Sequence, residues 1–318
     1  MKLTKTNAQK IANEYSFGKV KKVKYLSEGY VNYNYLFDTT KGKYSVQIIG
    51  DKLDNWKKER MALQFKVLNH LVKTKFPYQV PVPVKSKTGG EIIQKDNKYL
   101  WTYPFIEGET PKKITKKIFQ DIAKLTVDYH KGVSSLGILK DNAFYNGMHW
   151  LSGEYQKLKK VVPKNNLDKI MLRHVDLFEN LLEQLKKIKY GKRLITHSDI
   201  NSNNIILRDG KLVGLIDFDN IMAAPRAKDF AMALERNTYL TKNWSKRKQD
   251  IFLNEYNKHI PISKVEKKLI IPLILLENCG LFKWYYGGME KRRDHAYRAM
   301  INMIIETKHL VKECGILG

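Results

Sequence analysis

Three polar residues stand close together in the sequence at a spacing that suits chemistry on a charged substrate. Asp199, Asn204 and Asp217 all lie within one run, residues 194–220. A carboxylate such as that of Asp199 can act as a base toward a hydroxyl group. The oxygens of Asn204 and Asp217 are of the kind that Mg²⁺ prefers, together with substrate phosphates. These residue types indicate phosphoryl transfer, in which a protein mainly positions groups and neutralises charge.

A β-hairpin is predicted between Asn204 and Asp217. Residues 205–207 form a short apolar strand, and residues 212–216 form the return strand. Asp209-Gly210 between them is a strong two-residue turn, because glycine tolerates a positive φ. Such a hairpin brings Asn204, at the start of one strand, beside Asp217, at the end of the other.

The same stretch resembles the catalytic and metal-binding loops of the aminoglycoside phosphotransferase and choline kinase family, whose members are related to protein kinases. The family motif is His-Gly-Asp, four residues, Asn, a hairpin, and then Ile-Asp followed by Phe or Trp. Here it reads His197-Ser198-Asp199, Asn204 and Ile216-Asp217-Phe218. Ser198 replaces the glycine, and Asn201 stands where the family often has histidine. The resemblance implies that Asp199 is the catalytic base and that Asn204 and Asp217 hold Mg²⁺.

The resemblance also implies an α+β fold of the protein-kinase type, with two lobes. Residues 1–107 would form the smaller nucleotide-binding lobe, an antiparallel sheet with a helix, and residues 103–108 the hinge. Residues 108–318 would form a larger, mostly helical lobe with the catalytic loop and the acceptor site. Local patterns agree with the smaller lobe, because they predict a helix and several short strands. The helix is expected over residues 55–72 and the strands over 20–26, 31–37, 44–49 and 98–103.

ATP would bind between the lobes of such a fold. The residues that the resemblance assigns to nucleotide binding are Gly29, Asn32, Gln47, Glu59, Tyr103 and Phe105. The first two belong to a turn that faces the nucleotide, and the last two lie at the hinge, where backbone groups would pair with adenine. Gln47 is a departure, because the family usually has Lys or Arg there, gripping phosphates and pairing with the helix glutamate, here Glu59. Glutamine can donate a hydrogen bond but brings no charge.

Lys43 is a weak substitute for the missing cation. Strand alternation places Lys43 and Gln47 on one face, but they are separated by roughly 13 Å along the strand. The sequence therefore allows two outcomes at this position. One is an active kinase that tolerates an uncharged residue, and the other is a non-catalytic relative of the spore-coat type.

The acceptor is expected to be a small molecule with a hydroxyl group. Within the family, the closest resemblance is to the homoserine kinases of this fold, carried by residues 29–35, the Val-Pro-Val-Pro-Val run at 80–84, and residues 215–220. Choline, ethanolamine, sugar and aminoglycoside kinases share the scaffold, and fold does not settle substrate. The aromatic stretch at residues 282–286 either lines the acceptor pocket or belongs to the core.

Composition bounds the remaining possibilities. The net charge of +26 allows a nucleic-acid-binding protein, but the lysines are scattered and no motif for nucleic acid stands out. No specific nucleic acid partner is therefore expected. Two cysteines without metal-site spacing indicate a reducing compartment, and neither a signal peptide nor a membrane span is expected. We expect a cytoplasmic protein, and the sequence carries no signal for an oligomeric state.

Overall fold

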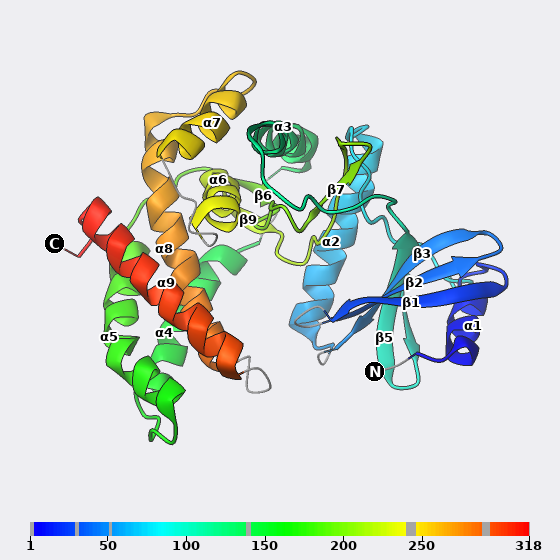
Figure 1. Ribbon diagram of the computed structural model, residues 1–318, viewed down its shortest axis with the longest axis horizontal. Coiled ribbons are helices and arrows are strands. Elements are labelled where there is room, and N and C mark those ends of the chain that lie inside the picture. Colours follow the sequence, from blue (N-terminus) through cyan, green and yellow to red (C-terminus); the bar gives the residue numbers. More distant parts are fainter. Residues whose placement is uncertain are drawn as a thin grey trace. The chain divides into compact units, whose positions relative to one another are not determined.

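The computed structural model describes residues 3–28, 32–50, 53–137, 141–239, 246–287 and 293–317. Contacts within the chain divide it into two compact units, whose elements are labelled in Figure 1. The first unit comprises Met1–Lys112 and Asn203–Ile221, and the second comprises Lys113–Ser202 and Met222–Gly318. The division after Lys112 lies five residues beyond the boundary expected at residue 107. The first unit also includes the hairpin, which the sequence had assigned to the larger lobe.

A five-stranded antiparallel sheet forms the centre of the first unit, with the strand order β1-β2-β3-β5-β4. Its strands are β1 (Val20–Glu28), β2 (Asn32–Thr39), β3 (Gly42–Ile49), β4 (Ile92–Lys95) and β5 (Lys98–Pro104). The helices of this unit are α1 (Lys5–Glu14) and α2 (Asn55–Lys73). The predicted strands and the predicted helix at 55–72 are confirmed to within a few residues at each end.

The two faces of this sheet have different environments because side chains alternate along each strand. On one face, Val46, Ile48 and Leu100 are buried in a core that also contains Ala8 and Ile11 of α1. The alternate residues of β3 and β5 point to the opposite face. That second face presents Gln47, Trp101 and Tyr103, and Trp101 contacts Phe65 of α2 with ring centroids 5.1 Å apart.

The predicted hairpin is confirmed as β7 (Ile205–Arg208) and β8 (Lys211–Leu215). Its turn residues, Asp209 and Gly210, have φ values of 50° and 72°, as a two-residue turn of this kind requires. The hairpin is held to the first unit through its backbone. Gln79 N–H donates to Val213 O at 2.8 Å, and Glu109 and Leu207 exchange two bonds of 2.9 and 2.8 Å. These bonds explain why the hairpin groups with the sheet.

The second unit is mostly helical. Its longer helices are α3 (Lys116–Val133), α4 (Ala143–Leu158), α5 (Asn166–Lys186), α6 (Ala227–Leu234), α7 (Lys246–Asn257), α8 (Lys264–Gly287) and α9 (Arg293–Cys314). A 3-10 turn, Ser134–Leu136, follows α3, and a π turn, Glu235–Tyr239, follows α6. Two short strands, β6 (Arg193–Thr196) and β9 (Met222–Pro225), pair antiparallel. None of the helices within the described ranges is long and apolar enough to cross a membrane.

The core of the second unit includes part of the aromatic stretch at 282–286. Phe282 is fully buried and stacks on Phe178 of α5, with ring centroids 4.1 Å apart. Tyr286 donates from its hydroxyl to Asp168 at 3.0 Å. The sequence left open whether this stretch lines the acceptor pocket or belongs to the core. Phe282 belongs to the core.

Gly108 is expected to be intolerant of substitution because it lies where the hinge meets the hairpin. Its φ is 144°, and a Cβ at this position would stand 2.3 Å from Leu207 O, a backbone atom that cannot swing away. We predict that Gly108→Ala lowers the free energy of unfolding in urea by about 1–3 kcal/mol. Gly147→Ala, at a position in α4 with open space around it, is the control and should be neutral or slightly stabilising. Equal effects of the two substitutions would contradict this account.

Candidate active site

Asn204 and Asp217 lie beside each other at the open end of the hairpin. Ile205 pairs with Leu215, and one step further Ile216 N–H donates to Asn204 O at 2.8 Å. Asp217 follows immediately with a φ of 63°, which is rare for a residue other than glycine. Such backbone conformations persist where the surroundings impose them, and they are frequent at functional sites. The hairpin register therefore brings together the two residues that were predicted to bind a metal ion.

A second carboxylate, that of Asp219, accompanies Asp217. Desolvation by the surrounding protein and the charge of Asp219 raise the pKa of Asp217 to about 7, although a hydrogen bond from the Asp219 backbone lowers it in part. Both side chains are exposed, and Asp219 lines a hollow of the first unit. Two crowded carboxylates favour a cation at this place. The sequence analysis missed Asp219, although an Asp-Phe-Asp run places two acids on one loop.

Asp219 is held by amide side chains from two other elements of the first unit. Asn32 of β2 donates from Nδ2 to Asp219 Oδ2 at 3.1 Å, and Gln64 of α2 donates from Nε2 to Oδ1 at 3.2 Å. Asn32, predicted to contact the nucleotide, thus links its strand to the loop that carries Asp217. Gly29, the other predicted residue of that turn, lies outside the described residues.

Gln47 points to the same side of the sheet, where the indole N–H of Trp101 donates to its side-chain oxygen. The two residues are register partners on β3 and β5. Gln47, Trp101, Gln64 and Asp219 line one hollow of about 450 Å³. Glu59, predicted to face the nucleotide, is exposed on α2 and does not line this hollow. Gln64 of α2, by contrast, contacts the loop of Asp217 and Asp219 through its hydrogen bond to Asp219.

The predicted hinge residues differ in their surroundings. Burial raises the pKa of the Tyr103 hydroxyl to about 12, and the charges of Asp217 and Asp219 contribute, so Tyr103 lies near the loop of these two acids. The Phe105 backbone N–H is already used, because it donates to Lys43 O at 2.9 Å. Adenine pairing of the predicted kind would therefore need other backbone groups of the hinge.

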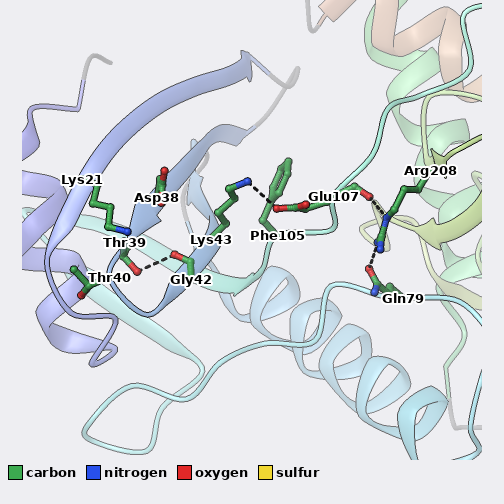
Figure 2. A pocket seen from close by; sticks show the side chains of 10 residues that line it. All are labelled: Lys21, Asp38, Thr39, Thr40, Gly42, Lys43, Gln79, Phe105, Glu107 and Arg208. Carbon is green, nitrogen blue, oxygen red and sulfur yellow. Dashed lines mark hydrogen bonds and ion pairs between the residues drawn. The ribbon is translucent and has the colours of Figure 1, made fainter.

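Lys43 stands at the hinge end of its strand. Its ammonium lies 2.7 Å from Glu107 Oε1, in a hollow of about 570 Å³ shown in Figure 2. Arg208 of the hairpin lies in the same hollow and donates from Nε to Glu107 O at 3.3 Å. The hydrogen bond and charge of Glu107 raise the pKa of Lys43. The structure thus gives Lys43 a role at the hinge.

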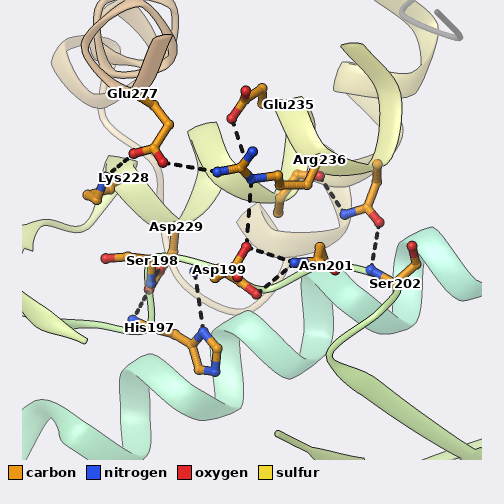
Figure 3. A network of polar contacts seen from close by, with 12 residues as sticks. His197, Ser198, Asp199, Asn201, Ser202, Lys228, Asp229, Glu235, Arg236 and Glu277 are labelled. Atoms are coloured by element: carbon orange, nitrogen blue, oxygen red, sulfur yellow. Dashed lines mark hydrogen bonds and ion pairs between the residues drawn. The ribbon is translucent and has the colours of Figure 1, made fainter. Parts of the chain in front are cut away.

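Asp199, the predicted base, belongs to the second unit and is oriented by two side chains (Figure 3). Asn201 donates from Nδ2 to Asp199 Oδ1 at 2.7 Å, and Arg236 Nε lies 3.7 Å from the same oxygen. The Asp199 backbone N–H donates to His197 Nδ1 at 3.3 Å. Asp199 is partly exposed, as a base that must meet a substrate has to be.

Asp229 at the start of α6 holds the loop before Asp199. Its carboxylate accepts the backbone N–H groups of His197 and Ser198 at 3.2 and 2.7 Å, and His130 Nε2 lies 2.8 Å from Oδ2. Asp229 therefore supports this loop through its backbone. Ser198 has a φ of 65°, the conformation that suits the glycine of the family motif. Its hydroxyl bonds that of Thr196 at 2.9 Å, and Asp229 fixes its backbone.

Arg236 connects Asp199 to a buried network of charges. Its guanidinium contacts Glu277 Oε1 at 3.0 Å and lies 3.9 Å from Glu235, while Lys228 Nζ lies 3.1 Å from Glu277 Oε2. Burial alone would lower the pKa of Arg236, but the charges of Glu235, Glu277 and Asp199 raise it. Arg236 therefore stays charged beside Asp199. The sequence analysis missed Arg236 because it lies in a π turn, outside the motif.

Comparison with known proteins identifies the family. The model of the phosphotransferase enzyme family matches residues 22–260. The chain belongs to this family. The resemblance noted in the sequence is thereby confirmed, and the protein is a phosphotransferase.

Two curated relatives of this phosphotransferase are homoserine kinases. The protein of Chelativorans sp. (strain BNC1) is 26% identical over 208 residues, covering 64% of this chain and 60% of that protein. The protein of Bradyrhizobium diazoefficiens is 21% identical over 266 residues, covering 82% of this chain and 77% of that protein. The matched stretch thus spans less than two thirds of the first of these relatives.

Solved structures confirm the kinase-like fold of the phosphotransferase. A microcompartment-associated aminopropanol kinase aligns with a TM-score of 0.71 at 17% identity, covering 98% of each chain. An amicoumacin kinase in complex with AMP-PNP, Ca²⁺ and Ami also gives 0.71, at 16% identity, covering 95% of this chain and 93% of that one. A spectinomycin phosphotransferase with ADP and spectinomycin gives 0.68 at 12% identity, covering 95% and 96%. At these identities the likeness concerns the fold.

Glu235 of the phosphotransferase should make stability depend on pH. Burial raises its pKa from 4.5 to about 7, with Arg236 and Lys228 lowering it and Glu277 and Asp199 raising it. Between pH 4.5 and about pH 7, the Glu235 carboxyl group keeps its proton in the folded state and loses it in the unfolded state. The free energy of unfolding therefore falls as pH rises through this window, by on the order of 2–3 kcal/mol.

We predict that Glu235→Gln abolishes this contribution. Urea unfolding at several pH values should show the variant gaining stability relative to wild type as pH rises from about 4.5 to about 7. Glu313→Gln on the exposed side of α9 is the control and should follow wild type. A constant difference between Glu235→Gln and wild type over this range would contradict the assignment.

Proposed function

We propose that this phosphotransferase is a kinase that transfers the γ-phosphate of ATP to the hydroxyl of a small molecule, with Mg²⁺, and that its acceptor is homoserine or a close analogue. The observation that carries the proposal is the hairpin register that sets Asn204 beside Asp217. Asp219 adds a second negative charge in that place. Asp199 stands five residues before Asn204 in the chain.

The residues beside the hairpin suit a magnesium ion. Asn204 and Asp217 offer the amide and carboxylate oxygens that Mg²⁺ prefers, and the crowded Asp217 and Asp219 carboxylates call for a positive charge. We assign Asn204 and Asp217 to this ion, as in the family motif. When bound, Mg²⁺ would neutralise charge on the phosphates of ATP.

The protein's own part in the reaction centres on Asp199. Its carboxylate would accept the proton of the acceptor hydroxyl while the hydroxyl oxygen bonds to the γ-phosphorus and the bond to ADP breaks. Asn201 and Arg236 contact Asp199 Oδ1 and so orient the carboxylate. Asp229 holds the backbone on which Asp199 stands. Phosphoryl transfer depends mostly on such positioning, so these supports matter as much as the base.

A hollow of about 370 Å³ in the second unit is our candidate for acceptor binding. Asn237 lines it and also accepts the Ser202 backbone N–H at 2.9 Å, which connects the hollow to the loop of Asp199. Lys116, Arg247 and Lys248 give its rim a positive charge. A positive rim favours an acceptor that carries an acidic group. The carboxylate of homoserine meets this requirement, whereas choline, ethanolamine and aminoglycosides bring only positive charge.

A panel of acceptors tests the proposal. ADP formation should be measured with homoserine, choline, ethanolamine, a hexose and an aminoglycoside. It should also be measured with the propanolamine that is homoserine without its carboxylate. We expect the highest kcat/KM for homoserine, and a marked loss for the propanolamine because it cannot use the positive rim. Preference for choline or an aminoglycoside would instead favour the related kinases of this fold. ATP binding without turnover on any acceptor would favour a non-catalytic homologue.

We predict that Asp199→Asn abolishes turnover while leaving ATP binding nearly intact. The amide cannot accept the proton, and a well-placed base contributes roughly 10²–10⁴-fold to rate. Turnover should be compared with the Kd for ATP in the same preparation. A variant with the kcat of wild type would refute the role assigned to Asp199.

We predict the opposite pattern for Asp217→Asn, which should weaken nucleotide binding in the presence of Mg²⁺. The substitution removes the main negative ligand assigned to the ion. Titration of ATP at low and at saturating Mg²⁺ measures the effect, and binding of nucleotide without Mg²⁺ serves as the control. Equal ATP affinity of wild type and variant at low Mg²⁺ would contradict the assignment.

A further inference from the structure

On the face of the sheet that carries Gln47, the one cation of β3 is Lys43, at the hinge end of the strand. The other residues of β3 that share this face, Ser45, Gln47 and Ile49, are all uncharged. The side-chain oxygen of Gln47 already accepts the Trp101 indole N–H. Lys43 is engaged with Glu107 at the hinge end. If ATP binds here, as proposed above, its phosphates must find positive charge on another element.

Helix α2 supplies two cations to this place. Lys57 and Arg60 both line the hollow of about 450 Å³ that also contains Gln47 and Asp219. They stand three residues apart, so they lie on one side of the helix, and Gln64 one turn further lies on the same side. Both side chains are half-buried.

The two cations lie near the loop of Asp217 and Asp219. Lys57 and Arg60 line the same hollow as Asp219, which stands two residues after Asp217 in the chain. Both cations are therefore close to the carboxylates beside which a metal-bound phosphate would lie. Asp54, the other acid of this hollow, is occupied as the helix cap, because its carboxylate accepts the Lys57 backbone N–H at 2.8 Å.

We infer that Lys57 and Arg60 of α2 bind the phosphates of the nucleotide, in place of the strand cation that Gln47 replaces. This inference rests on the proposed function. The arrangement reverses the usual polarity of the fold, in which the strand brings a cation and the helix an acid. Here β3 has the uncharged Gln47 at this position, and α2 carries the cations Lys57 and Arg60. Glu59, about 200° around the helix from Lys57, faces away from the hollow, which fits a site with no strand cation for it to pair with.

Nucleotide titrations of single variants test the inference. We expect Lys57→Ala and Arg60→Ala each to weaken binding of ATP with Mg²⁺ by about 10- to 100-fold, because a hydrogen bond to a charged group is lost. Binding of adenosine, which has no phosphate, should not change. Lys58→Ala is the matched control, since Lys58 is exposed and adjacent in α2 but does not line the hollow. Lys57→Gln, which keeps the length of the side chain without its charge, should behave as Lys57→Ala does.

A second-site variant separates charge from structure. Gln47→Lys places a cation on β3, and in the Lys57→Ala background it should restore much of the lost ATP affinity. The inference is overturned if Lys57→Ala and Arg60→Ala bind ATP as tightly as Lys58→Ala does. It is also overturned if they lose ATP and adenosine to the same extent. In either outcome the proposed function still stands if the wild-type protein binds ATP and turns it over. If the wild-type protein binds no nucleotide, both the proposed function and this inference are wrong.

Discussion

The repulsion between Asp217 and Asp219 is the constraint around which the first unit is arranged. Two carboxylates that stand two residues apart in one loop cannot both be charged at little cost unless hydrogen bonds or positive charges compensate them. Asn32 and Gln64 each donate a hydrogen bond to Asp219, and Lys57 adds positive charge nearby. These three residues come from β2 and α2, so the demand of the loop determines which helix and strand residues turn toward it. A bound cation would compensate the negative charge of Asp217.

The second unit handles charge differently, because there Asp199 lies beside a network of charged side chains. Arg236 stands between Asp199 and the pair Glu277 and Glu235, and Lys228 completes the chain of contacts. Breaking one member of such a buried set leaves the others uncompensated. The network therefore fixes Arg236, and Arg236 with Asn201 fixes Asp199. Both units must compensate negative charge. In the first unit the charge of Asp217 leaves room for an added cation, and in the second unit Arg236 and Lys228 supply the positive charge.

Some of this arrangement follows from the sequence and some does not. The hairpin could be predicted because its turn, Asp209-Gly210, specifies a local geometry. Arg236 and Gln64 could not, because each meets its partner across a long stretch of chain and neither belongs to a local pattern. Helical spacing places Lys57, Arg60 and Gln64 on one face of α2, but it does not say which face meets the loop of Asp217 and Asp219. Glu59, which was predicted to face the nucleotide, does not line the hollow on that face.

The assignment of residues 203–221 to the first unit has a consequence for how the chain is made. Residues 1–112 leave the ribosome first, but the strands and the acidic loop that complete their unit follow only after residues 113–202. Until then, Gln79 and Glu109 lack their hairpin partners, and Asn32 and Gln64 lack Asp219. The amino-terminal unit cannot finish folding during synthesis as an independent early domain. For the same reason, a gene cut at the hinge would yield two pieces, neither of which contains a complete first unit.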